Sequence, residues 1–278
     1  MDIKKLADVP PWEWPEDAAE TILQTLTNKQ ADDSDRLIAA ELGGENVVVN
    51  DELAGVLLAV VGSNEESDEL RGAAAIALGP ALEQAYVDEF EDGEDAGITE
   101  RMFHRIESSL QKLYIDEKVP KEVRRRVLEA SVRAPQDWHA NAIKAAYASG
   151  DDDWVLTAVF SMAHVRGFDE QILEALENPN PPVRYEAVRA AGNWELDAAW
   201  DHITVLLEDP KTSKPLQLAA IGAIASIRPN DAKQILIDLT DSDDEEIVEA
   251  AQEAMVMAAT LSDVSEEEGE WENGKWTA

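Results

Sequence analysis

The chain of 278 residues contains no cysteine. This absence excludes disulfides, thiolate nucleophiles and metal sites with cysteine ligands. No serine stands in a G-x-S-x-G turn, so nucleophilic catalysis has no signal in the sequence. The histidines do not lie at helical spacing from one another, and they are His104, His139, His164 and His202. We expect them to be structural, and we expect no metal and no cofactor.

Long apolar runs are also missing. The longest is residues 53–61, and the N-terminus leads into no apolar stretch of the kind a signal peptide needs. A membrane-spanning helix requires about 20 apolar residues. The sequence therefore predicts a cytoplasmic protein that does not enter a membrane.

Basic residues are scarce: 23 Lys and Arg face 59 Asp and Glu, a net charge of −36. Such a surface repels nucleic-acid phosphates and anionic membranes, so we expect neither as a partner. Two explanations of the acidity stay open. It serves solubility or a saline habitat, or it complements a basic protein partner.

Self-similar segments fill most of the chain. Each has an apolar residue, another four positions on, and then small residues; these segments begin at positions 70, 123, 154, 183, 216 and 247, with a weaker copy at 35–43. Four of the five spacings lie between 29 and 33 residues. The first spacing is 53 residues, which predicts an insertion near residues 86–99. Fixed periods of this length indicate a repeat architecture.

Polar residues three positions before the repeat segments predict where helices begin. Their side chains can accept a hydrogen bond from free N–H groups of a first helical turn. They are Ser67, Asp151, Asn180, Ser213 and Asp244. Pro181, Pro182 and Pro215 fall in first turns, where a missing N–H costs little.

A further helix is expected between successive segments, over residues 15–29, 50–62, 98–114, 135–149, 168–177, 195–208 and 229–240. The sequence therefore predicts an all-α solenoid of about seven antiparallel helix pairs, which bury their apolar faces by stacking. Residues 1–32 form an N-terminal capping segment with the first helix. Residues 33–260 form the solenoid, and residues 261–278 form an acidic, flexible tail.

The units P-V-R-Y-E-A-V-R-A-A-G at 182–192 and E-L-R-G-A-A-A-I-A-L-G at 69–79 resemble HEAT repeats. They are similar to the short bacterial form, which also occurs in phycobilin-lyase-type proteins. The resemblance implies an armadillo-like superhelix in which the second helix of each pair lines the concave face. HEAT proteins are mostly scaffolds and a minority are enzymes. The HEAT-type di-iron hydroxylases use His-Glu pairs, and this chain has no His-Glu dipeptide.

The segment 121–133 is the one net-positive helix that the sequence predicts. Glu122, Arg126, Glu129 and Arg133 alternate along one stripe, which favours ion pairs within the helix. Arg71, Arg124 and Arg184 share one repeat position, which suggests an arginine ladder between adjacent units. The functional alternative is an anionic ligand or acidic partner segment held by Arg125, Arg126 and Arg133.

Aromatic residues gather in the central repeats, where no end cap is needed. The candidate contact residues are Trp138, His139, Trp194 and Trp200. Tryptophan and arginine are frequent anchors of protein interfaces, although tryptophan at helical spacing also packs in cores.

The leading hypothesis is a non-catalytic, monomeric scaffold or adaptor that binds a protein through the central repeats. The partner would offer either a basic surface or an acidic segment that meets Arg125, Arg126 and Arg133. One alternative is a lyase or chaperone for a tetrapyrrole (bilin). Another is a DNA-repair HEAT protein, which the net charge disfavours.

Overall fold

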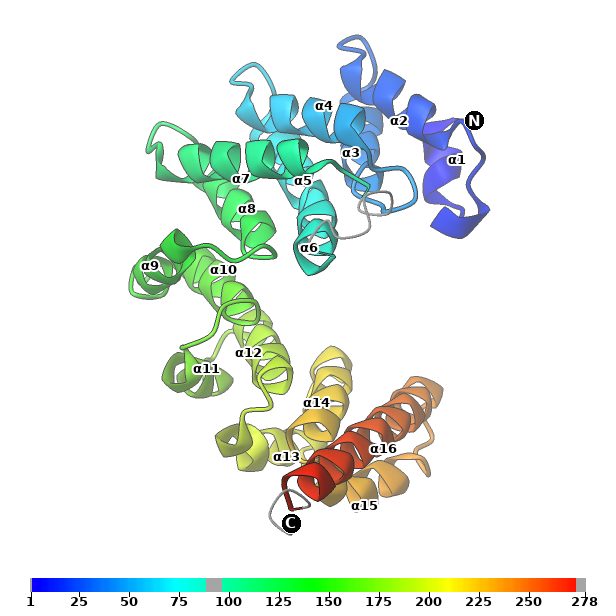
Figure 1. Ribbon diagram of the computed structural model, residues 1–278, viewed down its shortest axis with the longest axis vertical. Coiled ribbons are helices and arrows are strands. Elements are labelled where there is room, and N and C mark those ends of the chain that lie inside the picture. The colour runs from blue at the N-terminus through cyan, green and yellow to red at the C-terminus, as the bar shows by residue number, and fades with distance from the viewer. Residues whose placement is uncertain (1, 89–96, 274–278) are drawn as a thin grey trace. The chain divides into compact units, whose positions relative to one another are not determined.

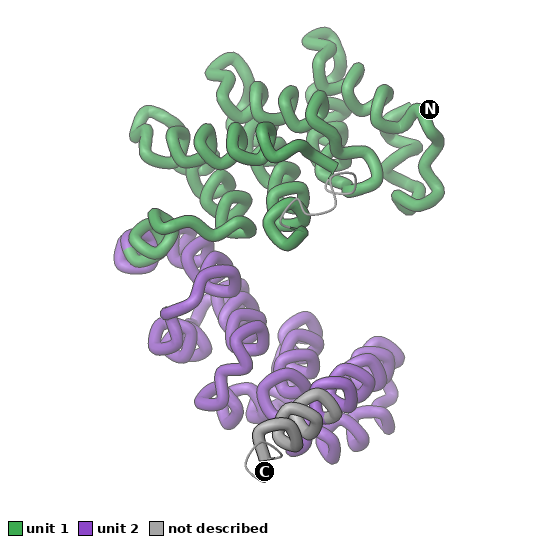
Figure 2. The backbone as a smooth tube through the Cα atoms, viewed as in Figure 1, with its two compact units in different colours: residues 1–144 green, residues 145–278 purple. Residues whose placement is uncertain are grey.

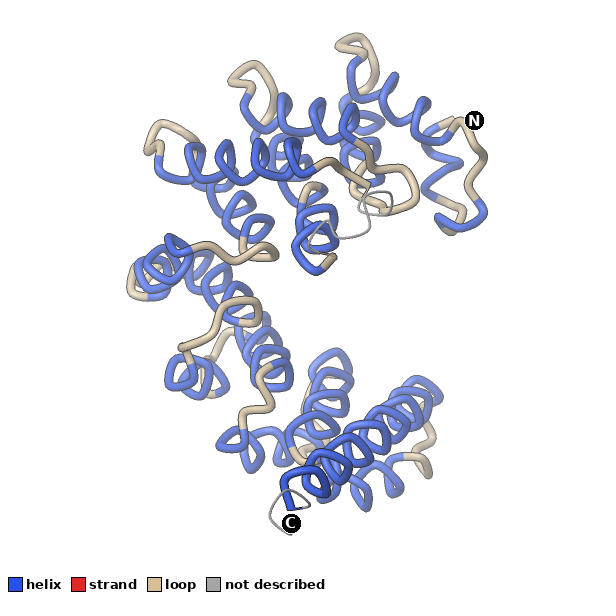
Figure 3. The backbone as a smooth tube through the Cα atoms, in the orientation of Figure 1, coloured by secondary structure: helices blue, strands red, loops and turns tan. Residues whose placement is uncertain are grey.

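The computed structural model describes residues 2–88 and 97–273, with side chains as far as residue 262. Every regular element in this part of the chain is a helix, and no strand occurs within it (Figures 1 and 3). The all-α prediction is confirmed. No helix in the described ranges is long and apolar enough to cross a membrane.

The chain divides into two compact units, Met1–Lys144 and Ala145–Ala278, coloured separately in Figure 2. The helices of unit 1 are α1 (Ile3–Ala7), α2 (Ala18–Thr27), α3 (Asp33–Leu42), α4 (Asp51–Gly62), α5 (Asp68–Ala77), α6 (Gly79–Val87), α7 (Glu100–Ile115) and α8 (Lys121–Ser131), with the 3₁₀ turn η1 (Pro11–Glu13). The boundary between the units falls inside α9 (Asp137–Tyr147).

The helices of unit 2 are α10 (Asp152–Met162), α11 (Asp169–Leu176), α12 (Pro181–Asn193), α13 (Trp200–Glu208), α14 (Lys214–Ile227), α15 (Pro229–Leu239) and α16 (Glu245–Asn273), with the 3₁₀ turn η2 (Asp197–Ala199). The backbone of α16 continues through residues 261–273 of the predicted tail. Residues 274–278 lie outside the described part of the chain.

Helix pairs stack in two layers within each unit. In unit 1 the pairs are α2/α3, α4/α5 and α7/α8, and their second helices α3, α5 and α8 pack side by side (Figure 1). In unit 2 the pairs are α11/α12, α13/α14 and α15/α16, with α12, α14 and α16 side by side. This is the repeating two-layer stack of an α-solenoid, as the sequence predicts.

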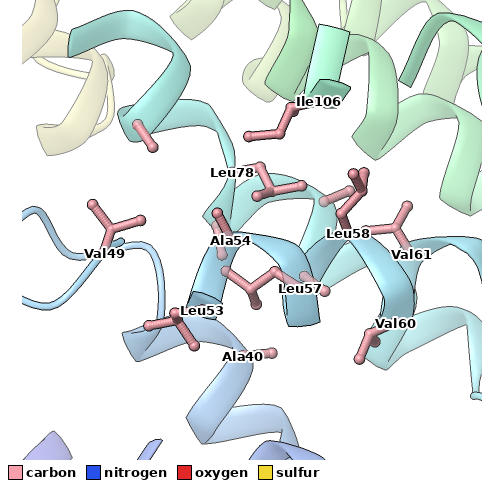
Figure 4. Close-up of a cluster of buried hydrophobic side chains, with 14 of the residues drawn as sticks. Ala40, Val49, Leu53, Ala54, Leu57, Leu58, Val60, Val61, Leu78 and Ile106 are labelled. Carbon is pink, nitrogen blue, oxygen red and sulfur yellow. The ribbon is translucent and has the colours of Figure 1, made fainter. Parts of the chain in front are cut away.

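The core of unit 1 lies between these layers. Its members include Leu57 of α4, Leu78 at the end of α5 and Ile106 of α7, none of which is exposed (Figure 4). Ala74 and Ala75 are also fully buried, so α5 approaches its neighbours closely. A dense contact of this kind tolerates little added volume.

The predicted helix starts are confirmed in position. Ser67 accepts a hydrogen bond from the Leu70 N–H at 3.2 Å, and Asp151 accepts from two first-turn N–H groups of α10. Asp244 accepts from the Glu246 N–H at 3.1 Å. Asn180 and Ser213 occupy the capping position without a side-chain bond to the helix, and prolines follow them in the first turn.

Arginines recur at one repeat position in unit 1, but each Nε–H bonds the preceding helix of its own pair and not the adjacent pair that the sequence predicts. The Nε–H of Arg36, Arg71 and Arg124 donates to the carbonyl of Leu26, Val61 and Tyr114, at 3.2, 2.9 and 2.7 Å respectively. Each acceptor is the penultimate residue of the preceding helix. The arginines therefore satisfy carbonyls that a helix C-terminus leaves free, and they place a positive charge at the negative end of the dipole.

The first of these arginines also joins successive pairs. Arg36 makes two bonds, of 2.7 and 2.8 Å, to the Glu66 carboxylate in the α4–α5 loop. This hydrogen bond raises the pKa of Arg36 and lowers that of Glu66. Arg184 of unit 2 departs from this pattern, because its buried Nε has no hydrogen-bond partner in the described structure.

The predicted insertion near 86–99 begins with the additional helix α6, which directly follows α5. Residues 89–96 of it lie outside the described ranges. Thr99 anchors the end of the insertion to α4. Its N–H and Oγ1–H donate to the two carboxylate oxygens of Asp51, both at 2.8 Å.

Close helix packing makes one glycine irreplaceable. A Cβ at Gly44 would lie 2.6 Å from the Ala77 carbonyl oxygen, whereas a Cβ at Gly55 would meet only the Met102 methyl, at 3.6 Å. We expect Gly44→Ala to lower the free energy of unfolding by about 1–3 kcal/mol. The control Gly55→Ala should leave it unchanged or raise it by up to about 1 kcal/mol. Urea denaturation measures both, and equal effects would contradict the packing described.

Candidate functional site

A groove of about 630 Å³ crosses the face formed by α3, α5 and α8 of unit 1. Helix α5 supplies the floor through Gly72, Ala73, Ile76 and Ala77, which share one helix face at four-residue spacing. Helix α3, the turn after it and the first turns of α8 supply the walls.

The groove is hollow because its floor residues are small. A Cβ at Gly72 would lie 3.1 Å from the Cγ of Arg126, so the Arg126 stem passes directly over this glycine. Two large apolar side chains remain exposed at the groove: Val47 at 59% and Ile76 at 37%. The result is an apolar groove in which Ile76 and Val47 keep exposed surface.

Carboxylates form the rim, and they are Glu41, Glu45, Asp68, Glu69 and Glu122. Arg126 is the one basic residue in the lining, and it is bonded to Glu122 at 3.0 Å and Glu129 at 2.8 Å. Burial opposes its charge, but these two carboxylates outweigh burial and raise the pKa of Arg126. The groove is therefore acidic overall.

Two of the three predicted contact arginines serve packing. Arg125 is buried, at 4% exposure, and it bonds Glu122 at 2.7 Å. Arg133 bonds Glu83 of α6 at 2.6 Å, and its stem lies against Gly79. Arg126 lines the groove and pairs with Glu122 and Glu129 as the structural interpretation predicts, whereas Arg133 pairs outside the predicted stripe.

Trp138 and His139 belong to a polar network in unit 1. His139 has no exposed surface; its Nδ1 accepts from the Gln136 N–H at 2.8 Å, and its Nε2 lies 3.0 Å from the Ser131 Oγ. The first bond makes Nδ1 an acceptor, so the neutral ring carries its proton on Nε2. Trp138 stacks on Tyr114, with 5.1 Å between ring centroids, and donates to the Gln136 side chain.

Trp194 and Trp200 lie in unit 2, each beside an arginine. Trp194 donates to the Met162 carbonyl at 2.6 Å, and Arg166 sits 4.2 Å above its ring. Arg228 lies 5.3 Å from the Trp200 ring centroid, in the range of a cation–π contact. None of the four aromatic candidates lines the groove of unit 1.

The groove residues Leu37, Glu41, Glu69 and Ile76 were not predicted from the sequence. A signal for Ile76 exists in the segment 69–79, because Leu70, Ala74 and Ala77 already account for a buried face of α5. Gly72, Ala73 and Ile76 give the same helix a second apolar face, which a helical projection reveals.

The lining of the groove is apolar at its floor and acidic at its rim. Its 15 residues include five carboxylates and no Ser, Thr, Tyr, Cys, His or Lys. In the described ranges, no group of three or more His, Asp or Glu side chains is placed to hold a metal ion. An apolar floor with a carboxylate rim suits a ligand that is apolar at its centre.

Comparison with known proteins adds a family match. Residues 170–256 match the family model described as HEAT repeats. No curated protein sequence matches the chain.

Three solved structures illustrate the similarity. Human deoxyhypusine hydroxylase in complex with glycerol is 15% identical, covering 87% of this chain and 96% of its own, with a TM-score of 0.40. Escherichia coli YibA is 14% identical, covering 92% and 97%, with a TM-score of 0.49. A designed armadillo repeat protein in complex with the peptide (KR)4 is 18% identical, covering 88% and 100%, with a TM-score of 0.33. All three scores lie below 0.5 and assign no function.

The buried histidine predicts a pH dependence. Burial lowers the pKa of His139 from its ordinary 6.5 to about 4. Below pH 6.5, His139 binds a proton in the unfolded chain but not in the folded chain. The free energy of unfolding therefore falls as the pH drops toward 4. Between pH 7 and 4.5, the free energy of unfolding of the native chain should fall by on the order of 2–3 kcal/mol more than that of His139→Gln.

The matched control is His104→Gln, since the His104 side chain is 63% exposed. Over the same pH interval, the free energy of unfolding of this variant should fall as much as that of the native chain. Urea unfolding at the two pH values measures the difference. An equal loss for His139→Gln and the native chain would contradict a neutral, buried His139.

Proposed function

Because the chain is a HEAT-repeat protein, we propose that it is a non-catalytic scaffold that binds a protein partner in the groove across α3, α5 and α8. One observation carries the proposal: two large apolar side chains stay exposed at the groove although the core beneath them is buried. They are Ile76 of α5, at 37%, and Val47 of the turn after α3, at 59%.

An open apolar face of this kind gains free energy when a partner covers it. Each 100 Å² of apolar surface removed from water contributes about 2.5 kcal/mol. The floor residues Gly72, Ala73 and Ile76 lie on one rigid helix, so little ordering is needed on binding. A rigid surface built on stacked second helices supports this use.

The two alternative functions find less support in this groove. A tetrapyrrole site would be expected to place tryptophan and arginine around the ligand, whereas this lining holds no tryptophan and one arginine that is already ion-paired. A site for DNA would need cations, whereas five carboxylates surround the floor. The groove favours a protein partner, and the expectation of a monomer agrees with a net charge of −36, which opposes self-association.

The proposal predicts a localised loss of partner binding. Ile76→Glu places a charge on the groove floor, while Val87→Glu makes the same change at a residue that is 70% exposed at the end of α6. Affinity purification of tagged native chain from its own cells should recover a stable partner. Ile76→Glu should recover at most one-tenth as much partner, because its affinity should be roughly tenfold weaker or more. Val87→Glu should recover as much partner as the native chain.

The outcome against the proposal is equally specific. Recovery of the same partner with Ile76→Glu, or recovery of none with the native chain, would exclude the groove as the binding surface. Circular dichroism confirms that both variants keep their helices.

A further inference from the structure

Resting on the proposed function, we infer that the groove selects a protein segment in which one large apolar side chain is flanked on both sides by lysine or arginine. The apolar residue would cover Gly72, Ala73 and Ile76. The flanking cations would meet the carboxylates of the rim.

The rim carboxylates stand at both ends of the floor. Asp68 and Glu69 lie in the first turn of α5, and Glu122 lies in the first turn of α8. Glu41 lies in the last turn of α3, and Glu45 follows in the next turn of chain. Helices α3, α5 and α8 repeat the same place in successive pairs and run the same way (Figure 1). The end of α3 and the starts of α5 and α8 therefore lie at opposite ends of the floor.

No contact among the described residues explains the acidic side chains at the end of α3, Glu41 and Glu45. A carboxylate near a helix C-terminus is unfavourable, since it faces the negative end of the dipole. The last turn of α3 contains no basic residue. Glu41, Glu45 and Glu69 are exposed, and none of them makes an ion pair with a described residue.

The cations already present leave the groove with uncompensated carboxylates. Arg126 is shared between Glu122 and Glu129, and Arg71 reaches Asp68 only at 3.8 Å. Cations from a partner would therefore find free acceptors at both ends.

Other occupants fit less well. A second copy would bring the same acidic rim and a net charge of −36. An acidic segment, a nucleic acid and an anionic lipid surface would each meet repulsion at the rim. A basic segment is attracted, and its apolar centre matches the floor.

The spacing of the segment follows from helix geometry. Glu69 and Ile76 are seven residues apart, which is about 10 Å along α5 at 1.5 Å per residue. An extended peptide rises about 3.3 Å per residue. On the side of Glu69, the basic residue should therefore stand about three positions from the apolar residue that covers Ile76.

Peptide selection on the full chain tests the inference. The probe is a display library of random 12-residue peptides, selected against the immobilised native chain at 50 mM salt. Enriched peptides should carry one large apolar residue with Lys or Arg on each side, about three positions away on one of them. The double variant Glu41→Gln/Glu45→Gln should weaken their binding roughly tenfold or more, and 500 mM salt should weaken it as well.

The matched control is Glu52→Gln/Glu117→Gln, which removes two exposed carboxylates of unit 1 that do not line the groove. It should bind the enriched peptides as the native chain does. Ile76→Glu should abolish their binding, and Val87→Glu should not.

The outcomes separate the two proposals. Peptides that depend on Ile76 but lack basic residues, or that ignore Glu41→Gln/Glu45→Gln, would overturn the inference and leave the groove as a binding surface. Peptides that bind Ile76→Glu unchanged, or no enriched peptides at all, would overturn the groove itself and the inference with it.

Discussion

Helix α5 lies between α3 and α8 and packs against α4, and this stacking is the constraint on which unit 1 depends. A single helix pair cannot bury its apolar faces alone, so each pair is stable only against its neighbours. The small residues of α5 permit the close approach. Gly44 fits against the backbone of Ala77 because it has no side chain.

The same stacking explains which groups the arginines of unit 1 contact. Arg36, Arg71 and Arg124 turn inward to bond carbonyls at helix ends, and Arg125 is buried against Glu122. Arg133 is bonded to Glu83. The chain has few basic residues, and in unit 1 much of their charge is used in packing. At the rim of the groove, Glu41, Glu45 and Glu69 are left without an ion pair to a described residue.

The repeat register could be predicted from the sequence because it depends on local features. Caps such as Ser67 and Asp151 act within one helical turn, and the apolar period fixes which helices pair. The exposure of single residues could not be predicted in this way. Arg125 and Arg126 are adjacent in the sequence. In the structure Arg125 is buried, whereas Arg126 lies at the groove.

The candidate site was harder to predict because its features depend on contacts distant in sequence. Trp194, for example, is satisfied by the Met162 carbonyl, 32 residues away. It was an interface candidate because aromatic residues gather in the central repeats. The second apolar face of α5 was visible in the sequence, but its exposure follows only once α3 and α8 are seen to flank it.

The central claim is that the face of α3, α5 and α8 is the binding surface. Hydrogen–deuterium exchange of the full chain, with and without an extended peptide bearing one leucine flanked by lysines, tests it most directly. The account predicts slower exchange in residues 41–47, 68–80 and 121–127, with the helices that do not line the groove unchanged. Protection confined to other helices, or no protection at saturating peptide, would contradict it.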